Sequence, residues 1–166
     1  MSNVPVNFKS SRIGKQAIAI PKGVTVKIND GVFHAKGPKG ELSQKLLPEV
    51  IVRIDEKIIQ VEQNTDPSVY SRRSRSIHGL TRSLLNNIVI GVSKGFTKVL
   101  EVIGVGYKAD VRGKKLVLNL GFPHLIDYPF PDGIKIEAKA GPQSTMVTVS
   151  GSNKEKVNQT AAEIRA

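Results

Sequence analysis

Two runs of strand-like sequence are separated by Ile77-His78-Gly79-Leu80-Thr81-Arg82-Ser83-Leu84-Leu85-Asn86-Asn87-Ile88-Val89-Ile90-Gly91, a stretch with the apolar period of a helix. A helix advances by about 100° per residue, so residues far apart in this stretch share a face. The apolar arc holds Val69, Ile77, Leu80, Leu84 and Ile88, and a second arc holds Ser71, Arg75, His78 and Arg82. The first arc predicts a core face and the second predicts a basic face.

The start of this helix is predicted at Asp66-Pro67. The Asp66 carboxylate can cap free amide groups, and proline suits the first helical position because its missing N–H is not needed there. The periodic stretch then runs to about Gly91. Arg73 falls inside the apolar arc, so we expect it near the frayed start or extended toward solvent.

Short strands precede the helix between Gly23 and Val61. They are predicted where apolar residues alternate or cluster, at residues 24–28, 32–35, 50–54 and 58–61. Asn29-Asp30-Gly31, Gly37-Pro38-Lys39-Gly40 and Asp55-Glu56-Lys57 supply the turns.

The same order of elements returns after Gly91. Strands are predicted at residues 99–103, 107–111, 116–120, 134–138 and 147–150. A second helix follows, with Ser152 and Glu155 in the spacing of a capping box and Val157, Ala161 and Ile164 as its apolar stripe.

Strands followed by one helix, twice, indicate an internal duplication. Pro48–Val52 resembles Pro131–Ile136, and the turns at Lys36–Lys39 and Arg112–Lys115 both place cations beside a glycine. Chance similarity among short strands is the alternative. We therefore expect an α+β fold of two duplicated domains, each a mainly antiparallel sheet packed against one helix. The N-terminal domain, with a basic N-terminal extension, would span residues 1–90 and the C-terminal domain residues 91–166.

Composition indicates an anionic partner. The chain has 25 Lys and Arg against 14 Asp and Glu, a formal net charge of +11. Such an excess favours nucleic acid, although anionic membranes and acidic proteins would also attract it. Aromatic residues make up only 5% of the chain, which favours structured RNA or its backbone over extensive base stacking.

Other functions lack their sequence signals. Without cysteine the chain has no disulfide, thiolate nucleophile or Cys-based zinc site, which suits a reducing compartment. His34, His78 and His124 have no metal-ligand spacing, and Gly104-Val105-Gly106 lacks the third glycine of a dinucleotide fingerprint. No stretch has the roughly 20 apolar residues of a membrane span, and Met1–Lys15 lacks the apolar core of a secretory signal. We expect a soluble, unexported protein that is not an enzyme and has no cofactor and no metal.

Several phrases together resemble one family. Residues 81–96, Ser11-Arg12-Ile13-Gly14-Lys15, Gly37–Leu42, Gly104–Ala109 and Leu118–Phe122 are similar, in order, to phrases of ribosomal protein six of the large subunit, of the bacterial or organellar type. The resemblance covers nearly the whole chain. It implies a structural constituent of the large ribosomal subunit that binds and stabilises 23S-type rRNA near the stalk base and the factor-binding region, supporting translation.

The same resemblance implies partners and a location. The partners would be large-subunit ribosomal RNA and neighbouring proteins of the stalk base, with translation factors nearby and no membrane. The location would be the ribosome, in a bacterial cytoplasm or a plastid. Family members usually continue into a Lys- and Gly-rich tail, whereas this sequence ends at Ile164-Arg165-Ala166. Either the sequence is incomplete or the RNA contacts lie elsewhere.

The candidate RNA-binding residues are cations on turns and strand ends, because such positions can approach a phosphate backbone without disturbing a core. In the C-terminal domain, the main predicted RNA-binding domain, they are Lys94, Lys98, Lys108, Arg112, Lys114, Lys115, Lys154 and Lys156; Gly104 and Gly106 are expected to permit close approach of RNA. In the N-terminal domain they are Arg12, Lys15, Arg75 and Arg82, and the helix face that carries the last two could instead pack against the other domain. Any single lysine among these could equally be an ordinary solvated charge.

Two other functions remain open. A free-standing RNA chaperone or assembly factor would have the same charge but would not stay with ribosomes through a high-salt wash. A hydrolase or transferase with an unusual site would require a pocket with convergent polar groups between the domains.

Overall fold

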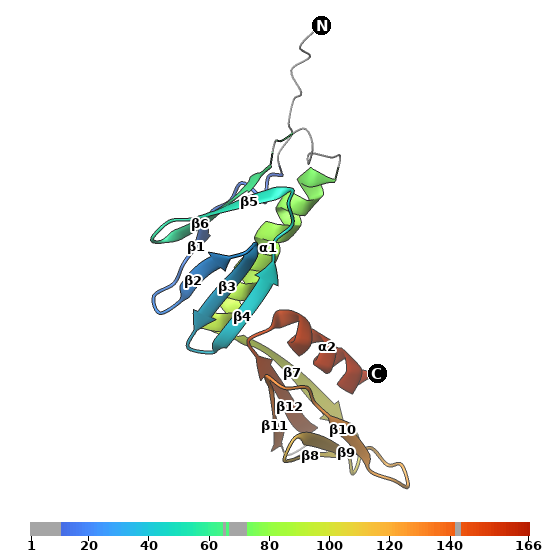
Figure 1. Cartoon of the computed structure of the whole chain (residues 1–166). Coiled ribbons are helices and arrows are strands. Elements are labelled where there is room, and N and C mark those ends of the chain that lie inside the picture. The colour runs from blue at the N-terminus through green and yellow to red at the C-terminus, as the bar shows by residue number, and fades with distance from the viewer. Residues whose placement is uncertain (1–10, 65, 67–72, 142–143) are drawn as a thin grey trace, which may run out of the picture. The chain divides into compact units, whose positions relative to one another are not determined.

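The computed structural model of the chain describes residues 11–64, 66, 73–141 and 144–166. It divides into two compact units, Met1–Val89 and Ile90–Ala166, called here the N-terminal and C-terminal units. Each contains antiparallel sheets and a helix (Figure 1). The predicted α+β fold with duplicated domains is confirmed.

The N-terminal unit contains two three-stranded antiparallel sheets. One has the order β1-β6-β5, formed by Ile18–Ala19, Ile58–Gln63 and Val50–Ile54. The other has the order β2-β3-β4, formed by Thr25–Asn29, Val32–Gly37 and Gly40–Lys45. Helix α1, Ser74–Ser93, follows β6 and ends beyond the boundary of the unit.

The C-terminal unit repeats this order. Its first sheet is β7-β12-β11, formed by Phe96–Ile103, Ser144–Gly151 and Ile134–Ala140. Its second sheet is β8-β9-β10, formed by Lys108–Arg112, Lys115–Asn119 and Ile126–Pro129. Helix α2, Lys154–Arg165, follows β12 and buries Val157, Thr160 and Ala161. The predicted stripe is confirmed for Val157 and Ala161, and Ile164 is half-buried against the same core.

The duplication is visible in the topology. Strands β1 to β6 and β7 to β12 have the same order of pairing, and each set is followed by a helix. The similar phrases that begin at Pro48 and Pro131 lead into equivalent strands, β5 and β11. Each is entered through a four-residue turn, in which the Val50 amide donates to the Leu47 carbonyl and the Ile134 amide to the Pro131 carbonyl. The turn types differ, because φ is positive at Gly133 (87°) but not at Glu49.

The predicted match between the two cationic turns is wrong. Arg112–Lys115 closes β8 and β9, which corresponds to the turn between β2 and β3, whereas Lys36–Lys39 lies at the turn between β3 and β4. The β2–β3 turn is Asp30-Gly31, with φ of 48° and 72°. Its counterpart is Gly113-Lys114, with positive φ only at Gly113 (64°). Both fit two-residue hairpin turns. In the second turn only the first position needs positive φ, so glycine occupies that position and lysine can occupy the next one.

The core face of α1 differs from the predicted one. Its buried residues are Ser74, Ile77, His78, Thr81, Leu85, Val89, Gly91 and Val92, whereas Leu80 is 54% exposed. Leu84 and Ile88 are half-buried, and Val69 lies outside the described residues. The observed core face is therefore rotated about the helix axis by roughly 100°, or about one residue step, from the predicted core face. The apolar pattern failed because polar side chains occupy the true core face.

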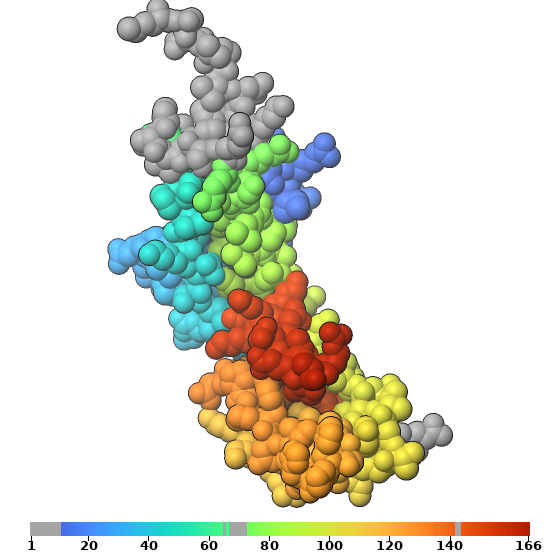
Figure 2. All heavy atoms as spheres, turned by 90° about the vertical axis from the view of Figure 1, so that its right-hand side faces the viewer, coloured from blue at the N-terminus to red at the C-terminus, as the bar shows by residue number. Residues whose placement is uncertain are grey.

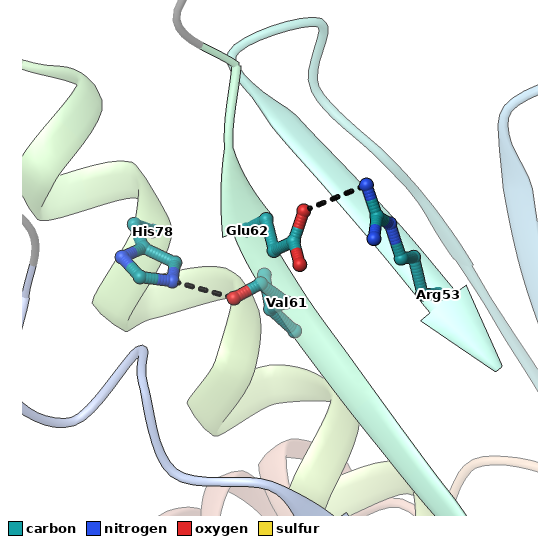
Figure 3. Close-up of polar contacts among 4 residues, drawn as sticks. All are labelled: Arg53, Val61, Glu62 and His78. Carbon is teal, nitrogen blue, oxygen red and sulfur yellow. Dashed lines mark hydrogen bonds and ion pairs between the residues drawn. The ribbon is translucent and has the colours of Figure 1, made fainter. Parts of the chain in front are cut away.

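His78 explains how a polar side chain is accommodated there. Its Nε2 lies 2.7 Å from the backbone oxygen of Val61 on β6, so Nε2 donates the hydrogen bond (Figure 3). The ring is only 1% exposed, and a Cβ on Gly14 would lie 2.5 Å from it. His78 thus joins α1, β6 and the segment around Gly14. The predicted basic face is therefore wrong for His78, which is buried, whereas Arg75 is exposed and Arg82 is half-buried.

The ends of both helices also differ from the predictions. Helix α1 begins at Ser74, later in the chain than predicted. The predicted cap at Asp66 and the first helical position at Pro67 involve residues 67–72, which lie outside the described residues. Arg73 is exposed immediately before the helix, as expected. In α2 the capping residue is Asn153 rather than Ser152, and its Oδ1 accepts hydrogen bonds from the amides of Glu155 (2.9 Å) and Lys156 (3.3 Å).

Candidate RNA-binding surface

All eight predicted cations of the C-terminal unit are exposed. Lys98 lies on β7, Lys108 and Arg112 on β8, and Lys115 on β9, whereas Lys94 and Lys114 lie in connections and Lys154 and Lys156 begin α2. Arg112, Lys114 and Lys115 gather at one hairpin, called here the β8–β9 turn. This turn is the densest group of candidate cations in the unit.

Two lysines of the β8–β9 turn have carboxylate partners. Lys114 Nζ lies 2.7 Å from Asp132 Oδ1, and Lys115 Nζ lies 3.9 Å from Asp127 Oδ2. The hydrogen bond and charge of Asp132 raise the pKa of Lys114, and the hydrogen bond from Lys114 lowers the pKa of Asp132. Both pairs are exposed, so water screens them and an incoming phosphate can compete for the lysines.

Helix α2 carries the other lysine pair. Lys154 Nζ lies 5.7 Å from the ring centroid of Phe96, which gives it a packing role within the unit. The charge of Lys156 contributes to the lowered pKa of Asp132. Asn153 and Glu155 already stabilise the first turn of α2, so a docked anion is not needed to explain two lysines there.

Gly104 and Gly106 have conformational roles. A Cβ on Gly104 would lie 2.4 Å from the Tyr107 ring, so this glycine makes room for the ring. Gly106 has a φ of 76° in the same turn and open space around its Cα. The contact with Tyr107 accounts for Gly104 and the positive φ accounts for Gly106, and close approach of RNA there stays a prediction.

Exposed apolar side chains lie in and beside this turn and in the β9–β10 connection. Val105 is fully exposed and Ile103 is 71% exposed, while Phe122 and Leu125 on the β9–β10 connection are each more than half exposed. The Phe122 ring stacks on the His124 ring, with 6.1 Å between the ring centroids. Composition alone did not reveal these exposed side chains, because the individual residues resemble ordinary strand and loop residues.

The candidate cations of the N-terminal unit flank one face of α1. Arg12, Lys15 and Arg75 are exposed, and Arg82 is half-buried with its Nε donating to the Gln16 carbonyl at 3.2 Å. Residues 11–16 form a tight turn in which the Lys15 amide donates to the Ser11 carbonyl. Figure 2 shows α1, in green, at the surface with the blue segment that follows Ser11 beside it.

Other kinds of site are not seen in the described part of the chain. Residues 11–64, 66, 73–141 and 144–166 contain no group of three or more His, Cys, Asp or Glu placed to hold a metal ion. Within the same ranges, no helix combines the length and hydropathy needed to cross a membrane.

The fold and its surface define a duplicated α+β protein with exposed cations on its turns. Comparison with known proteins gives the family: the model described as ribosomal protein L6 matches residues 20–95 and 103–166. The large ribosomal subunit protein uL6 of Listeria welshimeri is 48% identical over 156 residues, which cover 94% of this chain and 84% of that protein. The uL6 proteins of Trichlorobacter lovleyi and Novosphingobium aromaticivorans are 48% and 46% identical, covering 94% and 93% of this chain and 83% and 84% of theirs. The chain belongs to the ribosomal protein L6 family, and the resemblance found in the sequence is confirmed.

Proposed function

We propose that this chain is a structural component of the large ribosomal subunit that binds and stabilises 23S-type rRNA near the stalk base and factor-binding region. In this role it supports translation without catalysis. Neighbouring stalk-base proteins would adjoin it and translation factors would dock nearby. The bacterial relatives support a ribosome in a bacterial cytoplasm over one in a plastid.

The observation that carries the proposal is the β8–β9 turn. Three of the four residues of this turn, Arg112, Lys114 and Lys115, are cations that lie on a hairpin and are exposed to solvent. Lysine and arginine on such turns bind phosphate oxygens, and each neutralised phosphate releases counterions. Residues 91–166 are therefore proposed as the main RNA-binding domain.

The test measures affinity for protein-free 23S-type RNA across a range of salt concentrations. The triple variant Arg112→Ala, Lys114→Ala and Lys115→Ala should bind more weakly, with a salt slope lower by about 0.7–0.9 for each phosphate that is no longer neutralised. A matched control is Lys135→Ala, Lys139→Ala and Arg165→Ala, which removes three exposed cations from the same unit. Equal losses in both triples would show that only net charge matters and would contradict a site at the turn.

The alternative of a free-standing RNA chaperone is tested by sedimentation. We expect the chain to stay with the large subunit through a high-salt wash, because many shape-matched contacts would hold it there. Release at the salt concentration that removes loosely bound factors would favour the chaperone.

A further inference from the structure

A shallow groove runs along the solvent-facing side of α1 in the N-terminal unit. Its walls come from the turn at residues 11–13 and from the first half of the helix, and its volume is about 580 Å³. The lining residues are Ser11, Ile13, Arg75, Ser76, Gly79, Leu80 and Ser83. The groove is called here the α1 groove, and all of its lining lies within one unit.

Two glycines shape this groove. A Cβ on Gly79 would lie 2.8 Å from Ser11 Oγ, so the absence of a side chain lets the turn approach the helix. Gly14 lies against the buried His78 ring, which is itself fixed to β6 by the hydrogen bond to Val61 (Figure 3). The Ser11 hydroxyl oxygen also accepts a hydrogen bond from the Gly14 amide at 3.3 Å. The turn is therefore a fixed wall.

The two segments that form the walls of the groove carry only positive charges. Residues 11–16 and 74–93 carry Arg12, Lys15, Arg75 and Arg82 and contain no Asp or Glu. In the described part of the chain, none of these four is within ion-pair distance of a carboxylate, in contrast to Lys114 and Lys115. The N-terminal unit also has the larger excess, with 14 Lys and Arg against seven Asp and Glu.

The chemistry of the lining selects a ligand class. Guanidinium and hydroxyl groups donate hydrogen bonds to phosphate oxygens, and arginine can do so with two parallel bonds. Ile13 and Leu80, which are 52% and 54% exposed, offer apolar surface for a ribose. A membrane-binding helix would need a wider apolar face than these two residues provide.

We propose that the α1 groove is a second RNA-binding site, which holds a sugar–phosphate segment of the same ribosomal RNA. Arg75 and Arg12 would bind phosphate, with Lys15 and the free side of Arg82 beside them. The inference rests on the proposed function and adds a binding site on the N-terminal unit. The RNA would then be gripped by both units rather than by the C-terminal unit alone.

The test compares two double variants that change charge equally. Arg12→Gln with Arg75→Gln alters the groove, whereas Arg53→Gln with Lys57→Gln alters exposed cations at β5 and the turn after it. Figure 3 shows Arg53 paired with Glu62 on the side of β6 away from His78. Against protein-free 23S-type RNA, the groove variant should lose about tenfold in affinity per arginine and lower the salt slope by about 1.4–1.8. The control variant should bind like the wild type.

A second measurement locates the RNA directly. The chain has no cysteine, so Ala17→Cys and Ile51→Cys each provide a single attachment point for a hydroxyl-radical probe. Ala17 follows the turn that forms one wall of the groove but does not line the groove. Both side chains are exposed, so neither substitution should disturb the fold. The probe at residue 17 should cut the RNA backbone at a defined position that the groove variant no longer shows, and the probe at residue 51 should not cut there.

Each outcome decides the proposal. Wild-type affinity, slope and cleavage in the groove variant would overturn it, while a loss in the Arg112, Lys114 and Lys115 variant would leave the proposed function intact. Failure of the wild-type chain to bind RNA would remove both. An equal loss of heparin binding in the groove variant would assign the groove to polyanions in general and overturn the RNA assignment.

Discussion

Residues that maintain the fold and residues that are available for binding lie side by side on α1, and the sequence pattern does not distinguish them. His78 looked like part of a basic face, but it is a buried hydrogen-bond donor that fixes α1 to β6. Its neighbours Arg75 and Arg82 in the same pattern remain on the surface or at its edge. The buried His78 therefore maintains the fold, whereas the exposed Arg75 can contact a ligand.

Replacing His78 should destabilise the protein. His78→Ala removes the donor to the buried Val61 oxygen and leaves a cavity beneath Gly14, so we expect a loss of about 3 kcal/mol in the free energy of unfolding. Urea denaturation followed by circular dichroism measures it. His124→Ala is the control, because His124 is exposed, and it should cost less than about 1 kcal/mol. Equal losses would contradict the buried role.

The Asp132 carboxylate should titrate below its ordinary pKa of 3.8, because Lys114 donates a hydrogen bond to it. A depressed folded-state pKa means that the contribution of the pair is present above the unfolded pKa and is lost as pH falls through the folded one. Carbon-detected NMR should show a midpoint under 3.8 that rises in Lys114→Ala. Lys22→Ala should leave the midpoint unchanged, and a Lys114→Ala midpoint equal to that of the wild type would refute the pairing.

The same ion pair should restrain RNA binding. Asp132→Asn frees Lys114 for phosphate and removes a negative charge from the β8–β9 turn, so affinity for 23S-type RNA should rise by several-fold. Filter binding at low salt measures the change. Asp30→Asn, at the equivalent turn of the N-terminal unit, removes the same charge and should change affinity less.

Among the elements, the helix ends depend on single side chains. Asn153 rather than Ser152 accepts the free amides at the start of α2. Asn153→Ala should therefore cost about 1 kcal/mol of stability, and Ser152→Ala less than about 0.5 kcal/mol. Thermal or urea unfolding distinguishes the two assignments, since a capping box at Ser152 requires the opposite order.

The strands were predictable where one face is apolar. Alternation at β2 and clusters at β3, β5 and β6 gave positions within about two residues of the observed ones. Strand β4, Gly40–Lys45, was missed because its single large apolar residue is Leu42, and β10 was missed because it is short and ends in proline. The two-residue strand β1 carries too little pattern to detect.

The candidate site was predictable only in its composition. Cations beside turn residues identified the β8–β9 turn, but the pairing of Lys114 with Asp132 joins residues 18 apart and needs the folded sheet. The α1 groove was missed for the same reason, because the approach of Ser11 to Gly79 is a tertiary contact. Turns are determined by neighbouring residues in the sequence, whereas these ion pairs and grooves are formed by residues that come together only in the tertiary structure.

At the scale of the whole molecule, a net charge of +11 is distributed over both units. Residues 90–166 have 11 Lys and Arg against seven Asp and Glu, a smaller excess than in residues 1–89. Charge alone would therefore favour the N-terminal unit, while the geometry of the turns favours the C-terminal one. The proposed binding of RNA by both units would account for both observations.

Combining the variants of the two sites should give additive effects. The groove double variant and the β8–β9 triple variant change residues in different units that share no partner, so their losses in binding free energy should add to within about 0.5 kcal/mol. Their reductions in salt slope should add as well. A combined loss no larger than that of either variant alone would mean that the two sites do not engage one RNA molecule.

The repeated topology has an evolutionary consequence. Each strand and helix of one half has a counterpart in the other, so one copy can preserve the fold while the other changes toward a new function. The turn between the second and third strands illustrates this: one copy has Asp30-Gly31 and the other has Gly113-Lys114. Ancestral reconstruction of a single half would thus reveal whether the acidic or the basic turn came first, and when the two halves acquired different functions.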